Sequence, residues 1–538
     1  MKEKIKIGVL IDSLILQNWI IWILDKLSTH DNIQFDFIVI NKNKQTTKKK
    51  SSFSKKFFML ILFLEKKILW DNLNELHESA YKIPTNVKIY NEKADKKGIG
   101  YYFTKNTIIN IKSHKPDLIL RFGFGILRGE LLNIPKYGVW SYHHGDNKFN
   151  RGKPSCFYEI LHGEHRVGAI LQKLNNQLDN GKVIDRVHTK VINNSMLLTM
   201  NQLFKSSKQM MINNIVKLYN DKAINSIDNL PIMYDRPLYK IPTIINLLSY
   251  IKILLISKYK SYKKSDRRMN WALLFGVTSE GQHPLSIPMY KLREIKAPKG
   301  FFWADPFIRK INTGYEIFLE EFCLSNCKGV IKKIKIDKRA NIIEQSICID
   351  EPWHLSYPFI FKEKDDYYMI PESSQNNKLI IYKENKENNK WKVFKVLFDE
   401  GNLFDATVYK EGEKFWIFVN RSGFSERPDQ ELFIYHTNDI LKGNLTGHIN
   451  NPVKIDIASS RPAGNLFTYK NNLFRPSQNC SKYYGGELKI NKVINLNNTQ
   501  YEEEVYRTLS PFWNNNYNSL HTVNFCEDAI VYDVNLKK

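Results

Sequence analysis

Short apolar runs alternate with segments of helical spacing in the first part of the chain. The run 5–12 is apolar and leads into a polar turn, 19–27 has helical spacing, and 34–40 alternates as a second strand. The apolar run 116–120 opens directly into R-F-G-F-G at 121–125, the pattern of a buried strand that ends in a glycine-permitted turn. Alternating strands and helices predict a doubly wound α/β domain with a parallel sheet.

The densest polar motif of this domain lies within 116–184. G-V-W-S-Y-H-H-G-D-N-K-F-N-R-G occupies 138–152, a segment of helical pattern follows at 155–162, and a second apolar run at 167–171 precedes L-D-N-G at 178–181. Parallel α/β folds place their sites at strand ends, so this stretch is the expected site. No G-x-G-x-x-G follows the first strand, and a standard dinucleotide site is therefore not predicted.

Beyond residue 268 the pattern changes to short strands separated by turns. Aromatic strand-like runs recur at intervals of roughly 50 residues, as expected for the blades of a propeller. Five similar openings begin the repeats: W-A-D-P-F at 303–307, S-Y-P-F at 356–359, F-D-A-T at 404–407, S-R-P-A at 460–463 and L-H-T-V at 520–523.

A second strand follows each opening, and this predicts an all-β propeller of five blades. These second strands are 315–320, 367–370, 415–419, 473–474 and 529–533. The isolated strand 271–275 would add to the last blade and close the ring.

The length of 538 residues also indicates more than one domain, because single cores rarely grow much past about 250–300 residues. We therefore predict an α/β domain at 1–225, a basic amphipathic linker at 226–268 and the propeller at 269–538.

The stretch 116–152 resembles, without a gap, the catalytic domain shared by methionyl-tRNA, glycinamide-ribonucleotide and sugar N-formyltransferases. His143 falls on the histidine of that family, Arg151 on its R-G motif and Asp179 on its L-D-x-G aspartate. The family's asparagine, two positions before the histidine, is Ser141 here, and its S-L-L-P is replaced by G-D-N-K. The resemblance implies a Rossmann-like formyltransferase fold.

Formyl transfer to an amine passes through a tetrahedral oxyanion, so the site needs a hydrogen-bond donor beside the carbonyl and a base for the amine proton. The resemblance implies that His143 and Asp179 keep these roles. Ser141 has a hydroxyl that donates one hydrogen bond, but it is shorter than an amide. Either His144 or Asp146 supplies the extra polar group, or the reaction has changed.

The resemblance further implies 10-formyltetrahydrofolate as the cofactor. The residues expected to bind it are Phe122, Gly123, Phe124, Gly125 and Leu178. His144, Asp146 and Arg151 are expected on the substrate side. Two other interpretations stay open: the two histidines only satisfy a buried loop, or the domain has lost its catalysis.

The second half resembles the five-bladed propeller of arabinanase- and invertase-type glycoside hydrolases, and the propeller region at the N-terminus of plant glucosamine inositolphosphorylceramide transferases. The first residues of inner strands point to one axial pocket, where paired carboxylates about 5–10 Å apart suit glycosidic chemistry and also accept bonds from sugar hydroxyls. The predicted bowl consists of Asp305, Asp405, Arg461 and His521, with Glu320, Glu372 and Arg475 behind them. Sugar binding, glycosidase activity and a purely structural role in pinning the blades together stay open.

The formal charge of +25 and the pI near 9.4 call for an acidic partner or surface. Lysine runs at 42–56 and 252–268 accompany apolar runs at 57–64 and 242–256. Neither apolar run reaches the roughly 20 residues that span a bilayer. Each one either lies on an anionic membrane surface or packs on the domain as an amphipathic helix. No aromatic-interleaved basic motif appears, so no nucleic acid is expected.

The six cysteines form no C-x-x-C pair and no secretory signal precedes them, which predicts a reduced, cytoplasmic protein with the inner membrane face as a second location. Cys323 and Cys327 lack a second ligand pair, so no metal site is predicted.

Together these features predict an enzyme of surface-glycan or glycolipid biosynthesis that formylates an amino sugar, with a sugar nucleotide or lipid-linked glycan held partly by the propeller. The alternative is a glycosyltransferase-like or glycan-binding protein whose formyltransferase fold has lost folate chemistry. Methionyl-tRNA formylation is less favoured, because the enzymes of that type continue into a small barrel rather than a propeller.

Overall fold

The computed structural model divides the chain into two compact units, Met1–Ser265 and Asp266–Lys538, which we call unit 1 and unit 2. It describes residues 3–42, 52–177, 181–224, 226–228, 233–262, 270–279, 281–387, 390–399, 401–421 and 429–537. Among the helices within these ranges, none combines the length and the apolar character needed to cross a membrane.

Seven of the described strands of unit 1 form one sheet in the order β12-β11-β10-β8-β1-β3-β5. These strands are β1 (Ile5–Ile11), β3 (Ile33–Asn41), β5 (Lys88–Glu92), β8 (Leu118–Arg121), β10 (Val139–His143), β11 (Arg166–Lys173) and β12 (Lys182–Lys190). The five strands from β10 to β5 are parallel, and β11 and β12 continue the sheet antiparallel. The predicted parallel α/β unit is confirmed, with an antiparallel edge that the sequence pattern did not predict.

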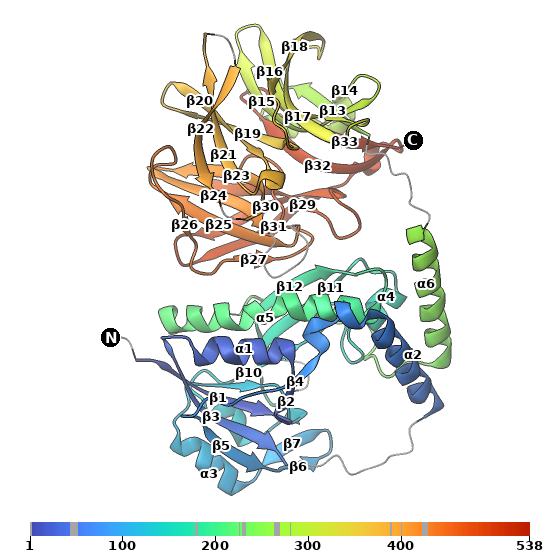
Figure 1. Ribbon diagram of the computed structural model, residues 1–538, viewed down its shortest axis with the longest axis vertical. Helices are drawn as coiled ribbons and strands as arrows, with labels where there is room; N and C mark the ends of the chain where they lie inside the picture. The colour runs from blue at the N-terminus through green and yellow to red at the C-terminus, as the bar shows by residue number, and fades with distance from the viewer. Residues whose placement is uncertain are drawn as a thin grey trace. The chain divides into compact units, whose positions relative to one another are not determined.

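Helices cover both faces of this sheet (Figure 1). α1 (Asn18–Ser28) and α5 (Met196–Asp221) lie on one face, and α3 (Lys105–Ser113) lies on the other. The helix expected at 155–162 is the short α4 (Phe157–Leu161), because the residue before it, Cys156, has left-handed backbone angles with φ 66°. Left-handed angles cannot continue an α-helix, so α4 cannot start earlier.

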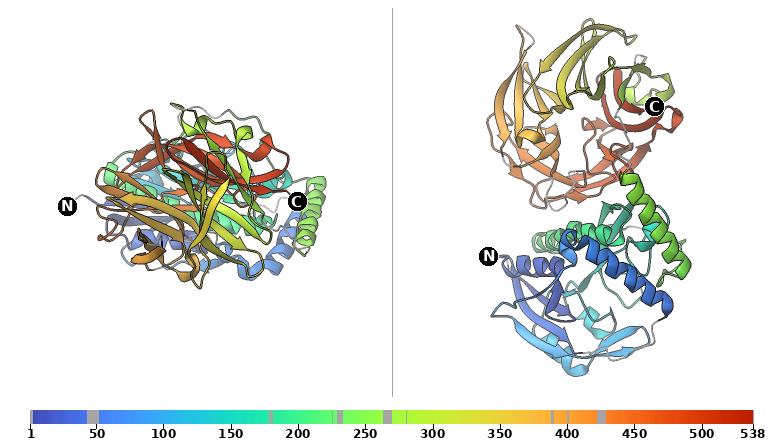
Figure 2. Two further views of the ribbon diagram at one scale, coloured as in Figure 1. Left: turned by 90° about the horizontal axis from the view of Figure 1, so that it is seen from above. Right: turned by 45° about the vertical axis from the view of Figure 1, so that its right-hand side comes forward.

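Smaller elements complete unit 1. β2 (Ile15–Gln17) pairs with β4 (Glu78–Ala80), and β6 (Ala94–Lys97), β7 (Gly100–Phe103) and β9 (Ile126–Leu127) form a three-stranded sheet. Two long helices, α2 (Phe53–Leu69) and α6 (Ile244–Tyr262), lie side by side at one edge of the unit in Figures 1 and 2. Helix α6 therefore forms residues 244–262 of the predicted linker 226–268.

Unit 2 is mostly β, and its described residues form five antiparallel sheets. Four of them consist of strands that follow one another along the chain. The first contains β15 (Phe301–Ile311), β16 (Gly314–Cys323), β17 (Lys328–Ile336) and β18 (Ile342–Ile349), and the second contains β19 (Ser356–Glu363), β20 (Asp366–Glu372), β21 (Leu379–Asn385) and β22 (Lys390–Phe398). The third contains β23 (Leu403–Glu411), β24 (Lys414–Arg421), β25 (Glu431–Thr437), β26 (Thr446–Gly447) and β27 (Lys454–Ile455), and the fourth contains β28 (Phe467–Tyr469), β29 (Asn472–Asn479), β30 (Glu487–Leu496) and β31 (Tyr501–Leu509).

The fifth sheet joins the two ends of unit 2. β13 (Trp271–Val277) and β14 (Arg293–Ile295) pair with β33 (Ala529–Leu536) and β32 (Tyr517–Phe525) in the order β14-β13-β33-β32. The isolated strand predicted at 271–275 thus pairs with the last strand of the chain, as expected. In the right-hand view of Figure 2 the five sheets follow one another around a common centre.

A β-bulge interrupts the first strand of several sheets at the predicted opening motif. The pairing register shifts between Ala304 and Phe307 in β15, with equivalent shifts in β19 and β23. The bulges contain Asp305, Tyr357 and Asp405, whose φ angles are 50°, 44° and 53°. Bulges re-aim side chains next to functional sites, and left-handed angles in non-glycine residues persist only where the surroundings enforce them.

Candidate functional sites

The first candidate site lies at the end of β10 in unit 1, where Ser141 and His143 project from the same face of the strand. Ser141 is buried, and it lies opposite Arg121 at the end of the neighbouring parallel strand β8. Gly145 lies close to the imidazole: a Cβ there would come within 3.1 Å of His143 Nε2. The two sequence-predicted residues are therefore together at a strand end, as expected for this fold.

Arg121 is the polar partner that the sequence analysis missed. Its Nη1 donates a hydrogen bond of 2.9 Å to Ser141 Oγ, and its Nη2 donates to the carbonyl of Gly125. Its Nε is buried and has no hydrogen-bond partner among the residues that the structure describes. Burial lowers the pKa of Arg121, and the charge of Asp12 opposes that shift. The signal available in the sequence was an arginine at the end of an otherwise apolar strand.

The turn after β8 is pressed against the end of β1. The Phe124 backbone N–H donates to Asp12 Oδ1 at 2.8 Å, and a Cβ on Gly123 would approach the Asp12 backbone nitrogen to 2.6 Å. Phe124 and Gly125 both have left-handed angles, with φ of 64° and 61°. Phe122 packs edge-on against Trp19, with 5.8 Å between ring centroids. Four of the five residues predicted to bind a cofactor thus form one fixed turn beside Arg121.

His144 lies in an aromatic cluster of unit 1. Its ring stacks on Tyr142 with 9° between the planes and contacts Trp19 and Phe204 at centroid distances of 5.1 and 4.2 Å. Burial, followed by the charges of His143 and Lys153, lowers the pKa of His144 to about 3. The imidazole is therefore neutral at physiological pH and anchors the loop through its ring.

Asp146 is held by an ion-pair network with β12. Its carboxylate accepts from Arg186 Nε at 3.1 Å, His188 Nε2 at 2.8 Å and the Lys148 backbone N–H at 3.0 Å. Arg186 also pairs with Asp228 at 2.9 Å. Burial opposes ionisation, but the hydrogen bond and charge of His188 and the charge of Arg186 lower the pKa of Asp146 to about 2. The carboxylate therefore stays ionised and fixes the loop 145–150 to the sheet.

The R-G motif contacts the segment that follows α5. The Arg151 backbone N–H donates to Tyr234 Oη at 2.5 Å, and its guanidinium lies 4.3 Å from the centre of that ring. Gly152 forms a parallel bridge with Tyr239 and has φ 101°. Leu178 and Asp179, the remaining predicted residues of unit 1, lie outside the described residues.

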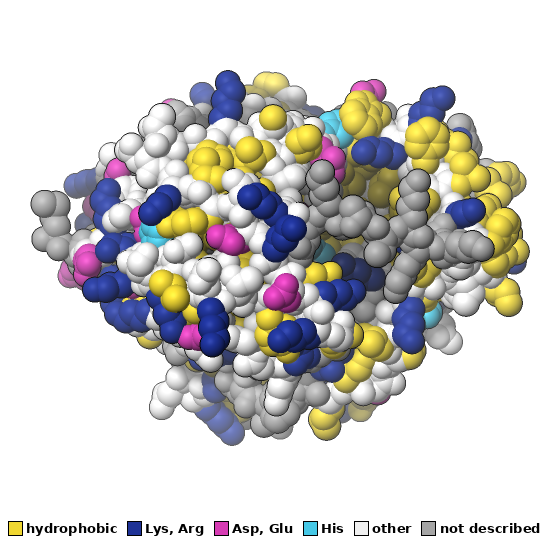
Figure 3. Space-filling view, turned by 90° about the horizontal axis from the view of Figure 1, so that it is seen from below, with side chains coloured by type: hydrophobic (Ala, Val, Ile, Leu, Met, Phe, Trp, Pro, Cys, Tyr) yellow, Lys and Arg dark blue, Asp and Glu magenta, His cyan; other side chains and the backbone are white. Residues whose placement is uncertain are grey.

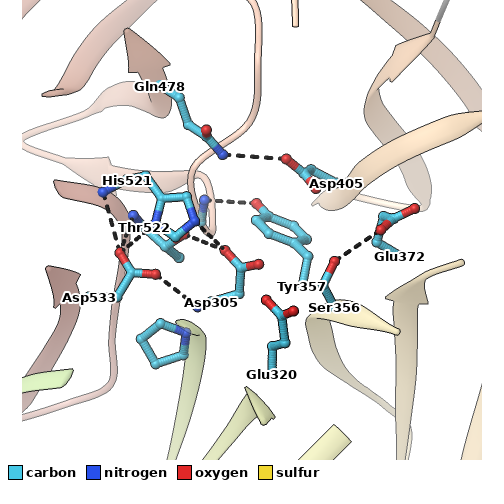
Figure 4. Close-up of polar contacts among 12 residues, drawn as sticks. Asp305, Glu320, Ser356, Tyr357, Glu372, Asp405, Gln478, His521, Thr522 and Asp533 are labelled. Atoms are coloured by element: carbon cyan, nitrogen blue, oxygen red, sulfur yellow. Dashed lines mark hydrogen bonds and ion pairs between the residues drawn. The ribbon is translucent and has the colours of Figure 1, made fainter. Parts of the chain in front are cut away.

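The second candidate site lies where the bulges of unit 2 meet, and Figure 4 shows its polar contacts. Asp305 Oδ1 accepts from Thr522 Oγ1 at 2.7 Å and lies 3.4 Å from His521 Nε2. His521 Nδ1 lies 2.7 Å from Asp533 Oδ1, whose carboxylate also accepts from the Asp305 backbone N–H at 2.8 Å. All four side chains are buried. The strands β15, β32 and β33 are therefore joined through one polar network.

Charge coupling within this network shifts its ionisation. Burial alone would lower the pKa of His521, but the charges of Asp533 and Asp305 raise it overall. Burial and the charge of Asp533 raise the pKa of Asp305, against the effect of His521. Single ligand atoms of Asp305, His521 and Asp533 lie within 4.8 Å of one another, a spacing that could hold a metal ion. His521 lies within ion-pair distance of both carboxylates, and Asp533 also accepts from the Asp305 backbone N–H.

A second network contains Asp405. Arg461 Nε and Nη2 donate to its two carboxylate oxygens at 2.6 and 3.2 Å, and Gln478 Nε2 adds a contact of 3.3 Å. Burial raises the pKa of Asp405 to about 6, although the charge of Arg461 lowers it. Tyr484 links the two networks. The centre of its ring lies 4.9 Å from Cζ of the Arg461 guanidinium, and the ring contacts His521 edge-on with 5.5 Å between ring centroids.

Two further carboxylates belong to β16 and β20. Glu372 accepts from Ser356 Oγ at 2.9 Å and from the Ser374 backbone N–H at 2.6 Å. Glu320 lies 3.6 Å from His354 Nε2, and burial together with the charges of Asp305 and Glu372 raises its pKa well above the usual range. Arg475, predicted behind the bowl, instead pairs with Glu503 of β31 at 2.6 Å.

The structure thus brings together five of the residues predicted for the bowl of unit 2: Asp305, Glu372, Asp405, Arg461 and His521. The sequence analysis missed Asp533, Thr522 and Gln478. A carboxylate within the apolar strand A-I-V-Y-D-V was the available signal for Asp533.

The folds and sites define a chain that joins an α/β unit with a polar strand-end site to a mostly-β unit with a buried polar cluster. Residues 282–516 match the family described as glucosamine inositolphosphorylceramide transferase 1, N-terminal. The transferase of that name from Oryza sativa subsp. japonica is 33% identical over 208 residues, which cover 38% of this chain and 27% of the relative. The chain therefore spans about a quarter of that relative's length.

A methionyl-tRNA formyltransferase from Prochlorococcus marinus (strain MIT 9312) is 24% identical over 243 residues, covering 44% of this chain and 65% of the relative. Both curated relatives are transferases by name. Among solved structures, a family 117 glycoside hydrolase from Zobellia galactanivorans aligns with 50% of this chain and 90% of its own, at 10% identity and a TM-score of 0.33.

Proposed function

We propose that this protein is a transferase of glycan or glycolipid biosynthesis in which unit 1 transfers a formyl group from 10-formyltetrahydrofolate to the amino group of a sugar. The observation that carries the proposal is the arrangement of Arg121, Ser141 and His143 at the ends of β8 and β10. The similarity to a formyltransferase and to a glycolipid transferase supports the two halves of the proposed reaction.

The residues at this strand end fit the proposed cofactor. Arg121 has a buried N–H without a hydrogen-bond partner among the described residues, and such a donor calls for an acceptor from a ligand. The fixed turn of Phe122, Gly123, Phe124 and Gly125 lies beside it, and Leu178 is expected from the resemblance to contact the cofactor as well. When bound, 10-formyltetrahydrofolate supplies the formyl group.

The chain's own residues would then stabilise charge and move one proton. Arg121 and His143 present donors for the negative charge that develops on a carbonyl oxygen at this strand end, where preorganised donors contribute most. Ser141 orients the guanidinium by accepting its Nη1–H. Asp179 is expected to orient His143 and to help remove the proton of the attacking amine, as the resemblance to formyltransferases implies.

For unit 2 we propose a five-bladed propeller that binds the sugar part of the acceptor. The five antiparallel sheets, the shared bulges and the pairing of the first strand with the last support this arrangement. Carboxylates and arginine at the centre suit sugar hydroxyls, with Asp405, Arg461 and Glu372 as the main contacts. The name of the rice relative points to a glucosamine-containing glycolipid as the class of acceptor, delivered as a sugar nucleotide or a lipid-linked glycan.

All six cysteines are free thiols, which supports a reducing compartment, and we expect the reaction to take place in the cytoplasm. A second candidate function is a glycosyltransferase-like or glycan-binding protein without folate chemistry. The observation that favours it is Ser141, which replaces the amide of the formyltransferase motif with a shorter hydroxyl.

Calorimetric titration of the full chain tests the proposal. The titrants are a stable 10-formyltetrahydrofolate analogue and a panel of nucleotide-linked amino sugars, and the variants are His143→Ala and Asp179→Asn, with Asp95→Asn on the exposed strand β6 as the control. Saturable folate binding that is weakened in both site variants and unchanged in the control supports formyl transfer. No folate binding, together with sugar binding that needs Asp405, supports the second candidate.

A further inference from the structure

Helix α2 exposes most of its large apolar side chains. Phe63 is 64% exposed and Ile68 is 77% exposed, and only Phe58, Ile61 and Glu65 of this helix are buried. The other large apolar side chains exposed on this segment are Phe53, Met59, Leu60, Leu64 and Trp70. An amphipathic helix of a soluble domain normally buries its apolar face, so this face is directed at something other than the core of unit 1.

Helix α6 repeats the same arrangement. Leu247 and Tyr250 are buried, whereas Ile245 is 78% exposed and Leu255 is 64% exposed. The sequence left open that each apolar run packs on the domain as an amphipathic helix. In the structure only one side of each helix packs in this way. Because a contiguous apolar surface marks an interaction site, the exposed sides of α2 and α6 need a partner.

The two helices form one surface. Tyr250 Oη donates to Glu65 Oε2 at 3.1 Å, and Ser54 Oγ donates to the Pro242 carbonyl at 2.5 Å. Figure 3 shows hydrophobic side chains gathered at the right-hand edge of the molecule, the side on which α2 and α6 lie in Figure 1. We call this surface, made of α2 and α6, the helix-pair face.

The charge of the helix-pair face is positive. Four exposed lysines, Lys55, Lys56, Lys66 and Lys67, lie on α2. The one carboxylate of α2, Glu65, is buried, where it accepts from Tyr250 and Ser195. The sequence of α6 contains no acidic residue. Lysine-rich sequence at 42–50 precedes α2, and the basic stretch 258–268 begins within the last turns of α6 and continues beyond it.

We propose that the helix-pair face docks on an anionic membrane surface, with the apolar side chains entering the boundary between headgroups and acyl chains and the lysines binding anionic headgroups. Helices with a basic polar side and exposed Phe, Leu and Trp bind in this way. Each lysine near an anionic bilayer adds attraction that salt screens. A second copy of the chain is disfavoured as the occupant, because it would bring the same positive charge against this face. This inference goes beyond the proposed function and does not depend on it.

Flotation of the full chain with vesicles tests the inference. One vesicle type is phosphatidylcholine alone, and the other mixes phosphatidylcholine with phosphatidylglycerol. The variants are Phe63→Glu/Ile68→Glu, which removes the apolar contact, and Lys66→Glu/Lys67→Glu, which reverses the local charge. Ile109→Glu is the matched control, because Ile109 is 62% exposed on the distant helix α3 of the same unit.

We expect the wild type and the Ile109 variant to float with anionic vesicles, and high salt to weaken both. Each double variant should lower the partition coefficient at least tenfold, since losing one large apolar contact already approaches a tenfold change. Absence of vesicle binding by the wild type, or equal binding by all four proteins, would overturn the inference. A wild-type dimer that the Phe63→Glu/Ile68→Glu variant converts to a monomer, without vesicle binding, would assign the face to self-association instead.

Discussion

Nη1 of Arg121 lies 2.9 Å from Oγ of Ser141, across two parallel strands that end side by side. Serine is shorter than the asparagine of the formyltransferase motif. The guanidinium of Arg121 reaches the position next to Ser141 from the neighbouring strand β8. We propose that Arg121, twenty positions earlier in the chain, supplies the hydrogen-bond donor that the shorter side chain of Ser141 lacks.

Replacing Arg121 tests this compensation. We expect Arg121→Met to reduce formyl transfer by about 10²–10³ in kcat, the effect of removing one oxyanion donor. Ser141→Ala should cost much less, because it removes only the acceptor that orients the guanidinium. Initial rates with an amino-sugar acceptor measure both variants, and thermal unfolding checks that each one folds. Equal losses in the two variants would mean that Arg121 acts only through Ser141.

Gly152 is required by the close approach of Tyr239. A Cβ at this position would lie 2.1 Å from the Tyr239 carbonyl oxygen, and φ is 101°. We therefore expect Gly152→Ala to destabilise unit 1 by roughly 2 kcal/mol or more. The backbone at Tyr239 would have to shift, and the alanine would have to adopt an unfavourable φ angle. Gly163→Ala is the control, because Gly163 also has a positive φ, 71°, but no atom within 4 Å of its Cβ position. Denaturant unfolding should show the larger loss at Gly152, and equal losses would leave only the backbone angle as the cause.

Glu320 should make the stability of unit 2 fall as pH rises. Burial and the charges of Asp305 and Glu372 raise its pKa in the folded state, so the folded protein holds a proton that the unfolded chain releases near pH 4.3. Folding is therefore favoured at low pH, and this stability is lost as pH rises toward the raised pKa. Glu320→Gln does not titrate and should raise the unfolding midpoint relative to wild type by about 2 °C or more at pH 8, with little change at pH 5. Glu344→Gln on the exposed part of β18 should show neither effect.

The sequence predicted elements well where local pattern decides structure. The strands 5–12 and 34–40 and the helix 19–27 match β1, β3 and α1, because apolar periodicity alone distinguishes them. The opening motifs at 303–307 and 404–407 coincide with bulges of unit 2 for a similar reason: a polar residue amid an apolar strand marks the point where the ladder is interrupted.

Long-range partners could not be predicted from the same patterns. Arg121 meets Ser141, and Arg186 meets Asp146, only because β8 and β12 take particular places in the sheet. The sequence likewise could not predict which side chains of α2 are exposed, because an apolar run at helical spacing has the same pattern whether it faces a core or a membrane. Strand order and tertiary cover, rather than propensity, decide these features.

The buried pair of Asp405 and Arg461 should control both the stability of unit 2 and its dependence on pH. Removing one member of a buried, doubly hydrogen-bonded pair leaves an uncompensated charge, so Arg461→Met should cost about 3–5 kcal/mol at pH 8. Burial raises the pKa of Asp405 to about 6 even though the charge of Arg461 lowers it, so without the arginine that pKa rises further. Because the carboxyl then holds its proton to higher pH, the folded variant should regain stability as pH falls from 8 toward 5, more steeply than wild type.

Denaturant midpoints of the full chain measured across this range check the slope, with Arg507→Met on the exposed strand β31 as the control. A loss of stability that is the same at pH 5 and pH 8 would mean that Arg461 stabilises unit 2 by packing rather than by its charge.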